Sequence, residues 1–242
     1  MTIRICMWSG PRNISTALMY AFAQRSDTVV VDEPFYGHYL SHTDAYTYHP
    51  GAEEIVATME NDWRKVVSDT ILAPTDAPVM FFKMMTHHIM EIDWAFMQDT
   101  VNVLLTRKPY DMLLSYTKKV ANPNLHDVGY ADHIRLLDYL RSLGQTPPVL
   151  EAETFLQNPR LVLQRLCQRI GIPFEEGMLS WEAGARPEDG VWAKYWYRSV
   201  HQSTGFRPYT PRPEPFPERL QPLLAECLPY YEQLAQVAIP AE

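Results

Sequence analysis

The chain has 242 residues, of which 46% are hydrophobic and 21% are charged, and its formal net charge is -8. The length and composition predict one soluble domain over residues 1–242 with a sizeable core. The negative net charge excludes a protein that binds nucleic acid through an overall basic surface. No apolar run is long enough to cross a membrane. The three cysteines have neither metal nor disulfide spacing, and the first predicted strand begins almost at the N-terminus, so we expect a cytoplasmic protein without a signal peptide.

The first predicted strand, residues 3–8, runs into a small polar turn, and the apolar stretch 17–23 predicts a helix after it. N–H groups at a helix start lack intrahelical partners, and the helix dipole favours an anion there, so this arrangement suits a phosphate. Arg12 adds a positive charge to the turn. The turn is not a Walker A loop, because Ser15 and Thr16 stand where that motif needs Gly and Lys. An ordinary turn that caps the helix is the alternative.

A second strand is predicted at 28–31, and it ends at Asp32 and Glu33. Ligands of open α/β sheets bind at the carboxyl ends of strands, which makes Glu33 a candidate general base or substrate anchor. A solvated loop carboxylate is the alternative interpretation. Residues 36–51 are predicted to form a wet, aromatic loop that acts as a lid or contacts the substrate, or else a plain surface loop. Its histidines fit no metal template.

Residues 52–72 predict an amphipathic helix, and residues 78–84 predict a central strand. The strand runs into His87 and His88, and a histidine with a near-neutral pKa is a natural acceptor for the proton of an attacking hydroxyl. Either histidine is therefore a candidate base, with His87 slightly preferred and Glu33 as the rival. The alternative is a histidine that only bonds to backbone at a helix start.

The strand predicted at 101–105 leads to Arg107, and Ser115 follows in the helix after it. A guanidinium and a hydroxyl together suit a phosphate group, although Arg107 paired with a carboxylate is the simpler alternative. Further helices are predicted at 127–143, 160–170 and 217–237, with a last strand at 148–153. The region 181–206 is rich in aromatic residues and contains Lys194 and Ser203, and an aromatic packing helix is its simplest interpretation.

Two of these segments together resemble the sulfotransferases that use 3′-phosphoadenosine 5′-phosphosulfate. Their 5′-phosphosulfate loop reads roughly Pro-Lys/Arg-Ser-Gly-Ser/Thr-Thr, and here Pro11, Arg12, Ser15 and Thr16 match it. Asn13 is a mild change and Ile14 replaces the usual Gly. Their second motif, Arg-x-Pro-x-Asp-x-x-x-Ser, is matched at each fixed position by Arg107, Pro109, Asp111 and Ser115.

The resemblance implies an α/β fold of the P-loop NTPase type, a three-layer sandwich with a mostly parallel central sheet. It implies sulfuryl transfer from 3′-phosphoadenosine 5′-phosphosulfate to a hydroxyl or amine of a small-molecule acceptor, leaving adenosine 3′,5′-bisphosphate and needing no metal. It assigns the nucleotide to residues 11–16, Arg107 and Ser115, with Arg12 also catalytic, and to Lys194 or Ser203 in an incomplete version of the family's Gly-rich loop.

Two other functions stay open at this stage. One is a P-loop kinase that uses ATP and Mg²⁺, against which stand the missing Walker lysine and the Arg107–Ser115 motif. The other is a non-catalytic nucleotide-binding or interaction protein on the same fold, which Ile14 and the incomplete Gly-rich loop favour. The sequence identifies neither the acceptor nor the oligomeric state.

Overall fold

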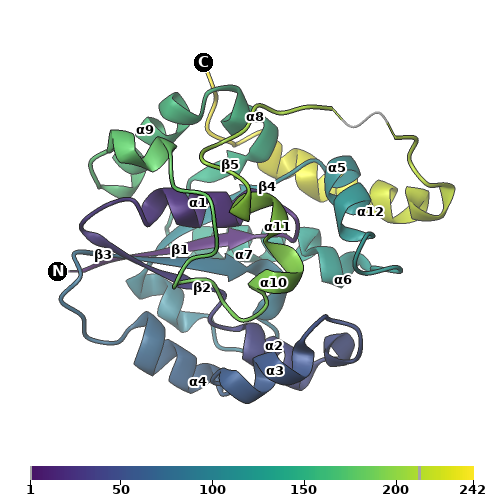
Figure 1. The fold of residues 1–242 in the computed structure, drawn as a ribbon, viewed down its shortest axis with the longest axis horizontal. Helices are drawn as coiled ribbons and strands as arrows, with labels where there is room; N and C mark the ends of the chain where they lie inside the picture. The colour runs from purple at the N-terminus through teal and green to yellow at the C-terminus, as the bar shows by residue number, and fades with distance from the viewer. Residues whose placement is uncertain (1, 212–213) are drawn as a thin grey trace.

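Five strands form the central sheet, in the order β2-β3-β1-β4-β5 (Figure 1). The computed structural model describes residues 2–211 and 214–242. Every strand pair in this part of the chain is parallel, which confirms the α/β class with a parallel sheet. The strands are β1 (Ile3–Ser9), β2 (Thr28–Asp32), β3 (Val79–Met85), β4 (Val101–Thr106) and β5 (Val149–Glu151).

Helices cover both faces of the sheet because alternate strand residues point to opposite faces. In β1, Ile5 and Met7 join one core, whereas Cys6 and Trp8 join the other. The first core includes α1 (Ser15–Phe22), α8 (Ala152–Gln157) and α9 (Pro159–Ile170). The second includes α4 (Trp63–Val66), α7 (Tyr130–Ser142) and α12 (Gln221–Ala235). The result is the three-layer sandwich that the sequence predicted.

The segment predicted as a wet loop at 36–51 is instead largely helical and partly buried, so that prediction was wrong. It forms α2 (Tyr36–His42) and a 3₁₀ turn at Asp44–Thr47. Tyr36, Tyr39 and Leu40 recur at helical spacing and are between 1% and 3% exposed. They pack against α3 (Ala52–Thr58), so the rings form a small core of their own.

Two predicted helices are interrupted. The helix expected at 52–72 is divided into α3, α4 and a π-helical turn at Val67–Ile71, because Asp62 caps α4 by accepting a bond from the Arg64 N–H at 2.9 Å. The helix expected at 127–143 is divided into α6 (Leu125–Val128) and α7, because Gly129 between them has a left-handed φ of 70°.

The remaining helices are α5 (Pro109–Tyr116), α10 (Ala193–Trp196) and α11 (Arg198–His201). At the C-terminal end, the Ile239 N–H donates to the Val149 carbonyl at 2.8 Å, so the last residues lie beside β5. Across residues 2–211 and 214–242, the structure contains no helix with the length and apolar character needed to span a membrane.

Candidate active site

One cavity of about 590 Å³ lies at the carboxyl ends of the inner strands, where ligands of such sheets bind. It brings together residues that follow β1, β2, β3 and β4. Lys194 is the single predicted site residue outside its lining. The predicted residues that line it are Pro11, Arg12, Asn13, Ile14, Ser15, Thr16, Glu33, His87, His88, Arg107, Ser115 and Ser203.

The turn after β1 has its unusual backbone at Arg12, not at Ile14. Arg12 has a positive φ of 54°, whereas Ile14 has a φ of −88°, which any side chain adopts. The isoleucine in place of the family's glycine therefore causes no backbone strain. Asn13 fixes the turn by accepting from the Ile14 N–H at 2.9 Å and donating to the Leu105 carbonyl at 3.2 Å. No side chain caps α1, so its first N–H groups remain available to an anion.

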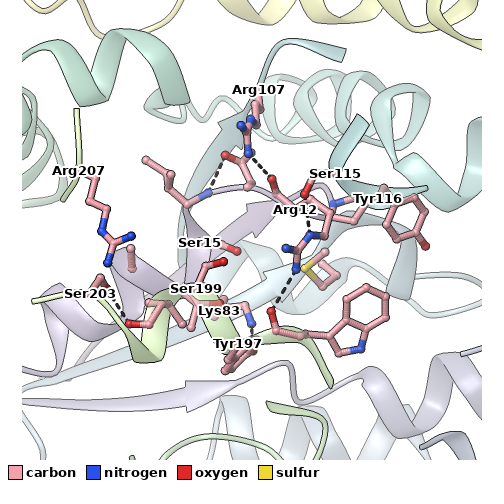
Figure 2. A pocket seen from close by; sticks show the side chains of 18 of the residues that line it. Arg12, Ser15, Lys83, Arg107, Ser115, Tyr116, Tyr197, Ser199, Ser203 and Arg207 are labelled. Atoms are coloured by element: carbon pink, nitrogen blue, oxygen red, sulfur yellow. Dashed lines mark hydrogen bonds between the residues drawn. The ribbon is translucent and has the colours of Figure 1, made fainter. Parts of the chain in front are cut away.

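The two predicted phosphate-binding motifs touch each other through hydrogen bonds (Figure 2). Arg107 Nη1 donates to the Arg12 carbonyl at 2.6 Å across 95 residues of sequence. Arg12 Nε donates to Ser115 Oγ at 3.0 Å, and Arg12 Nη1 donates to the Trp196 carbonyl at 3.1 Å. Both guanidinium groups therefore line one wall of the cavity in defined orientations.

The segment after α11 supplies a further cation that the sequence interpretation missed. Arg207 lines the cavity, donates to the Gln202 carbonyl at 2.6 Å, and lies across the view of Figure 2 from Arg12. Ser203 also lines the cavity, but its hydroxyl already donates to the Val200 carbonyl at 2.6 Å. Nothing in the spacing around Arg207 distinguishes it from other surface arginines, so no sequence signal identified it.

Lys194 is placed differently from the other predicted ligands. Its ammonium pairs with the exposed carboxylate of Glu54, and its side chain is about half exposed. This ion pair, outside the cavity lining, gives Lys194 a structural partner that the sequence did not indicate.

In the cavity lining, a buried lysine holds two carboxylates together. Lys83 Nζ lies 2.6 Å from Asp32 Oδ1 and 2.6 Å from Glu33 Oε1, and it also contacts the Tyr197 hydroxyl. Burial opposes its charge, but the two carboxylates outweigh burial and raise the pKa of Lys83 above its ordinary value. A lone lysine inside the apolar run 78–84 was the available sequence signal, and the structure adds that Lys83 is in register with Asp32.

Glu33 belongs to this cluster and also lines the cavity. It has a positive φ of 41°, which is rare for a residue with a side chain, and it directly follows β2. Burial raises the pKa of its carboxyl more than the Lys83 ammonium lowers it. Its Oε2 lies 4.0 Å from His88 Nδ1.

His87 and His88 form a 3₁₀ turn after β3, and both are 2% exposed. His88 is stacked between Tyr36 and Tyr39, with ring centroids 4.7 Å and 4.6 Å away. Burial, with the neighbouring imidazoles, holds the pKa of both histidines well below its ordinary value. Both rings are therefore neutral at pH 7. In the described part of the chain, no three histidine, cysteine or acidic residues are arranged to hold a metal ion.

Helix α10 and its flanks add aromatic side chains to the cavity. The Tyr197 hydroxyl donates to Asp32 Oδ2 at 2.7 Å and accepts from Trp192 Nε1 at 3.1 Å. Through these bonds the segment is tied to the end of β2. The rings of Trp192, Trp196 and Tyr197 line the cavity together with Tyr36 and Tyr116.

A parallel sheet with a cationic turn between strand and helix defines an α/β protein with a ligand site at its strand ends. The match to known families is more specific, because the sulfotransferase domain family matches residues 3–238 of the chain. The chain therefore belongs to the sulfotransferase domain family.

Two solved structures share the fold. One is the sulfotransferase domain from the curacin biosynthetic pathway, with a TM-score of 0.52 and 17% identity over 95% of this chain and 98% of that chain. The other is the sulfotransferase domain from the Synechococcus PCC 7002 olefin synthase, with a TM-score of 0.58 and 16% identity over 95% of this chain and 96% of that one. At these identities the similarity concerns the fold alone.

Curated relatives from Arabidopsis thaliana are closer in sequence. Branched-chain-amino-acid aminotransferase-like proteins 2 and 1 are 36% and 37% identical to this chain over 228 residues. The match covers 94% of this chain and 40% of each relative. The chain thus spans less than half the length of these relatives.

Proposed function

We propose that the chain transfers a sulfuryl group from 3′-phosphoadenosine 5′-phosphosulfate to a hydroxyl or amine of a small-molecule acceptor. The observation that carries the proposal is the contact between Arg107 and the Arg12 turn. It supports one bound molecule with two separate phosphate groups, because each motif is suited to one phosphate and both line the same cavity.

The residues present fit this donor nucleotide. The N–H groups at the start of α1 and the Arg12 guanidinium suit the 5′-phosphosulfate, and Arg107 with Ser115 suits the 3′-phosphate. Arg207 and Ser203 would approach from the opposite side. When bound, the nucleotide supplies the activated sulfuryl group.

Among the three candidate bases, we propose Glu33. The buried histidines have pKa values well below the ordinary value, which makes them weak bases, whereas burial raises the pKa of Glu33 toward neutrality. Its strand-end position and positive φ support a carboxylate held at the cavity wall. Lys83, bonded to the other carboxylate oxygen, fixes the orientation of the group.

In the proposed reaction, Glu33 accepts the proton from the acceptor as the acceptor's oxygen or nitrogen forms its bond to sulfur. The bond between sulfur and the bridging phosphate oxygen breaks, and its electron pair stays on the phosphate. Arg12 and the N–H groups of α1 stabilise the negative charge that develops there. These hydrogen-bond donors are already oriented toward the oxygen on which the charge develops, so they stabilise it without rearranging during the reaction.

Calorimetric titration with adenosine 3′,5′-bisphosphate, beside ADP and ATP with and without Mg²⁺, tests the donor. We expect binding of the bisphosphate, weakened about 10- to 100-fold in Arg107→Ala because a charged hydrogen-bonding partner is lost. Arg141→Ala is the matched control, since Arg141 pairs with Asp138 on the exposed side of α7. Mg²⁺-dependent ATP binding would instead support the kinase alternative, and binding of no nucleotide would support a non-catalytic protein.

A further inference from the structure

Several side chains that line the cavity have a buried polar atom without a hydrogen-bond partner among the described residues. These polar atoms are His49 Nε2, His87 Nδ1, His88 Nδ1, Tyr116 Oη and Trp196 Nε1. Burying a polar atom without a hydrogen bond costs free energy, and native proteins rarely gather several such atoms. Their concentration at one cavity indicates a ligand that offers several hydrogen bonds.

The three imidazoles form one cluster around the α2 tyrosines. The His87 and His88 ring centroids are 4.5 Å apart, and His88 and His49 lie 4.6 Å and 5.8 Å from Tyr39. The His49 Nδ1 atom is already bonded to the Tyr36 hydroxyl at 2.8 Å, which leaves its Nε2 for a ligand. A neutral imidazole nitrogen either donates or accepts according to its tautomer, and a hydroxyl group can match both.

The charges around the cavity disfavour a cationic acceptor. Aromatic faces are the usual site for a ligand cation, but here the protein's own cations already lie over two of them. The Arg12 guanidinium is 5.9 Å from the Trp196 ring centroid, and Lys83 Nζ is 4.8 Å from that of Tyr197. The cavity's arginines are assigned to the negatively charged donor, so an anionic acceptor would be repelled both by Glu33 and by the bound donor. The remaining walls therefore suit an uncharged molecule.

A phenol would fit the aromatic walls, but its single hydroxyl would be used in the reaction. The imidazole nitrogens would then stay without partners. In a molecule with several hydroxyls, one hydroxyl can react beside Glu33 while others form hydrogen bonds with the histidines. Glu33 Oε2 and His88 Nδ1 are 4.0 Å apart, so one small molecule can contact both. We propose that the acceptor is an uncharged polyol or sugar whose non-reacting hydroxyls bond to His49 and His88. This inference rests on the proposed function.

The test measures release of adenosine 3′,5′-bisphosphate from the phosphosulfate donor with three groups of acceptors. Glucose, sorbitol and myo-inositol represent polyols, 4-nitrophenol and 2-naphthol represent phenols, and choline and ethanolamine represent amino alcohols. We expect turnover with at least one polyol, at a kcat/KM about tenfold or more above that of any phenol or amino alcohol, because unpaired polar groups discriminate against ligands that cannot match them.

Variants connect the preference to the named nitrogens. His88→Phe and His49→Phe keep a ring in place and remove the hydrogen-bonding nitrogens, so we expect the KM for the polyol to rise about tenfold with a smaller change in kcat. His42→Phe is the matched control, because His42 is an exposed imidazole of α2 outside the cavity lining. Deoxy analogues of the active polyol should lose less in His88→Phe than in the parent protein.

The outcomes separate the two proposals. Turnover of a phenol or an amino alcohol with all polyols inactive, or polyol kinetics unaffected by both His→Phe changes, overturns the acceptor proposal while leaving the donor proposal intact. Inactivity of every polyol in a protein that still binds adenosine 3′,5′-bisphosphate also overturns the acceptor proposal alone. Failure to bind the bisphosphate overturns the donor proposal and, with it, this inference.

Discussion

The two ends of the cavity are built in different ways. We propose that one end holds the donor's phosphates, called the phosphate end here, and that the other holds the acceptor, called the acceptor end. The phosphate end consists of two short motifs, each following one strand. The motifs are joined by hydrogen bonds from Arg107 to the Arg12 carbonyl and from Asn13 to the Leu105 carbonyl. The acceptor end is assembled from α2, the turn after β3 and the segment around α10, which are far apart in the sequence. The first end depends on local geometry and the second on packing. Substitutions at the two ends should therefore differ in their effects on turnover, nucleotide binding and stability.

Glu33→Gln should have the largest effect, at the acceptor end. Loss of a general base lowers kcat by about 10²- to 10⁴-fold, while bisphosphate binding stays unchanged. Because the pKa of Glu33 is raised, activity of the parent protein should be present above that pKa and fall as the pH drops through it. A pH–rate profile of the variant that keeps this acid limb would contradict Glu33 as the base.

Arg12→Ala should have the next largest effect, at the phosphate end. Removing a preorganised donor costs about 10²- to 10³-fold in kcat. Arg12→Gly is the matched control, because both variants lose the charge while Gly also relieves the positive φ of 54°. Urea unfolding should therefore find the Gly variant about 1 kcal/mol more stable than the Ala variant, and equal catalytic loss in both. Turnover retained in either one removes Arg12 from the mechanism.

Lys83→Met should act mainly on stability, since it leaves Asp32 and Glu33 buried without their cation. Breaking a buried ion pair costs about 3–5 kcal/mol, which urea unfolding at pH 7 measures. Burial already raises the pKa of Glu33, and without the ammonium its carboxyl would bind a proton still more readily in the folded state, so the deficit should shrink as the pH falls. A deficit that is the same at pH 5 and pH 8 would contradict this explanation.

Lys194→Ala should have the smallest effect. Its ammonium pairs with exposed Glu54 and its side chain lies outside the cavity lining, so we expect less than about a twofold change in bisphosphate affinity. Calorimetric titration of Lys194→Ala and Arg107→Ala with adenosine 3′,5′-bisphosphate compares the loss of affinity in the two variants. An equal loss in both variants would show that the segment around α10 moves Lys194 onto the nucleotide.

The sequence was sufficient for the strands, their parallel arrangement and the placement of the Arg12 and Arg107 segments at strand ends, because each depends on local patterns. It was insufficient for the acceptor end. Tyr36 and Tyr39 have helical spacing, but the polar residues around them are typical of a loop. Their burial depends on packing against α3, which the local sequence does not predict. The link between Lys83 and Tyr197 spans 114 residues, and no local pattern predicts it. The two predicted helices that are interrupted have a periodic apolar pattern on both sides of the break. Each break is caused by a single residue, the capping Asp62 or the left-handed Gly129, which the periodic pattern does not reveal.

The bond from the Ile239 N–H to the Val149 carbonyl has a consequence away from the cavity. β5 is the outermost strand on its side of the sheet, and the free backbone groups of such a strand are a template for pairing with another molecule. The last residues occupy part of that row of groups. Their position therefore protects the domain against intermolecular strand pairing and aggregation, a role in solubility that is independent of any ligand.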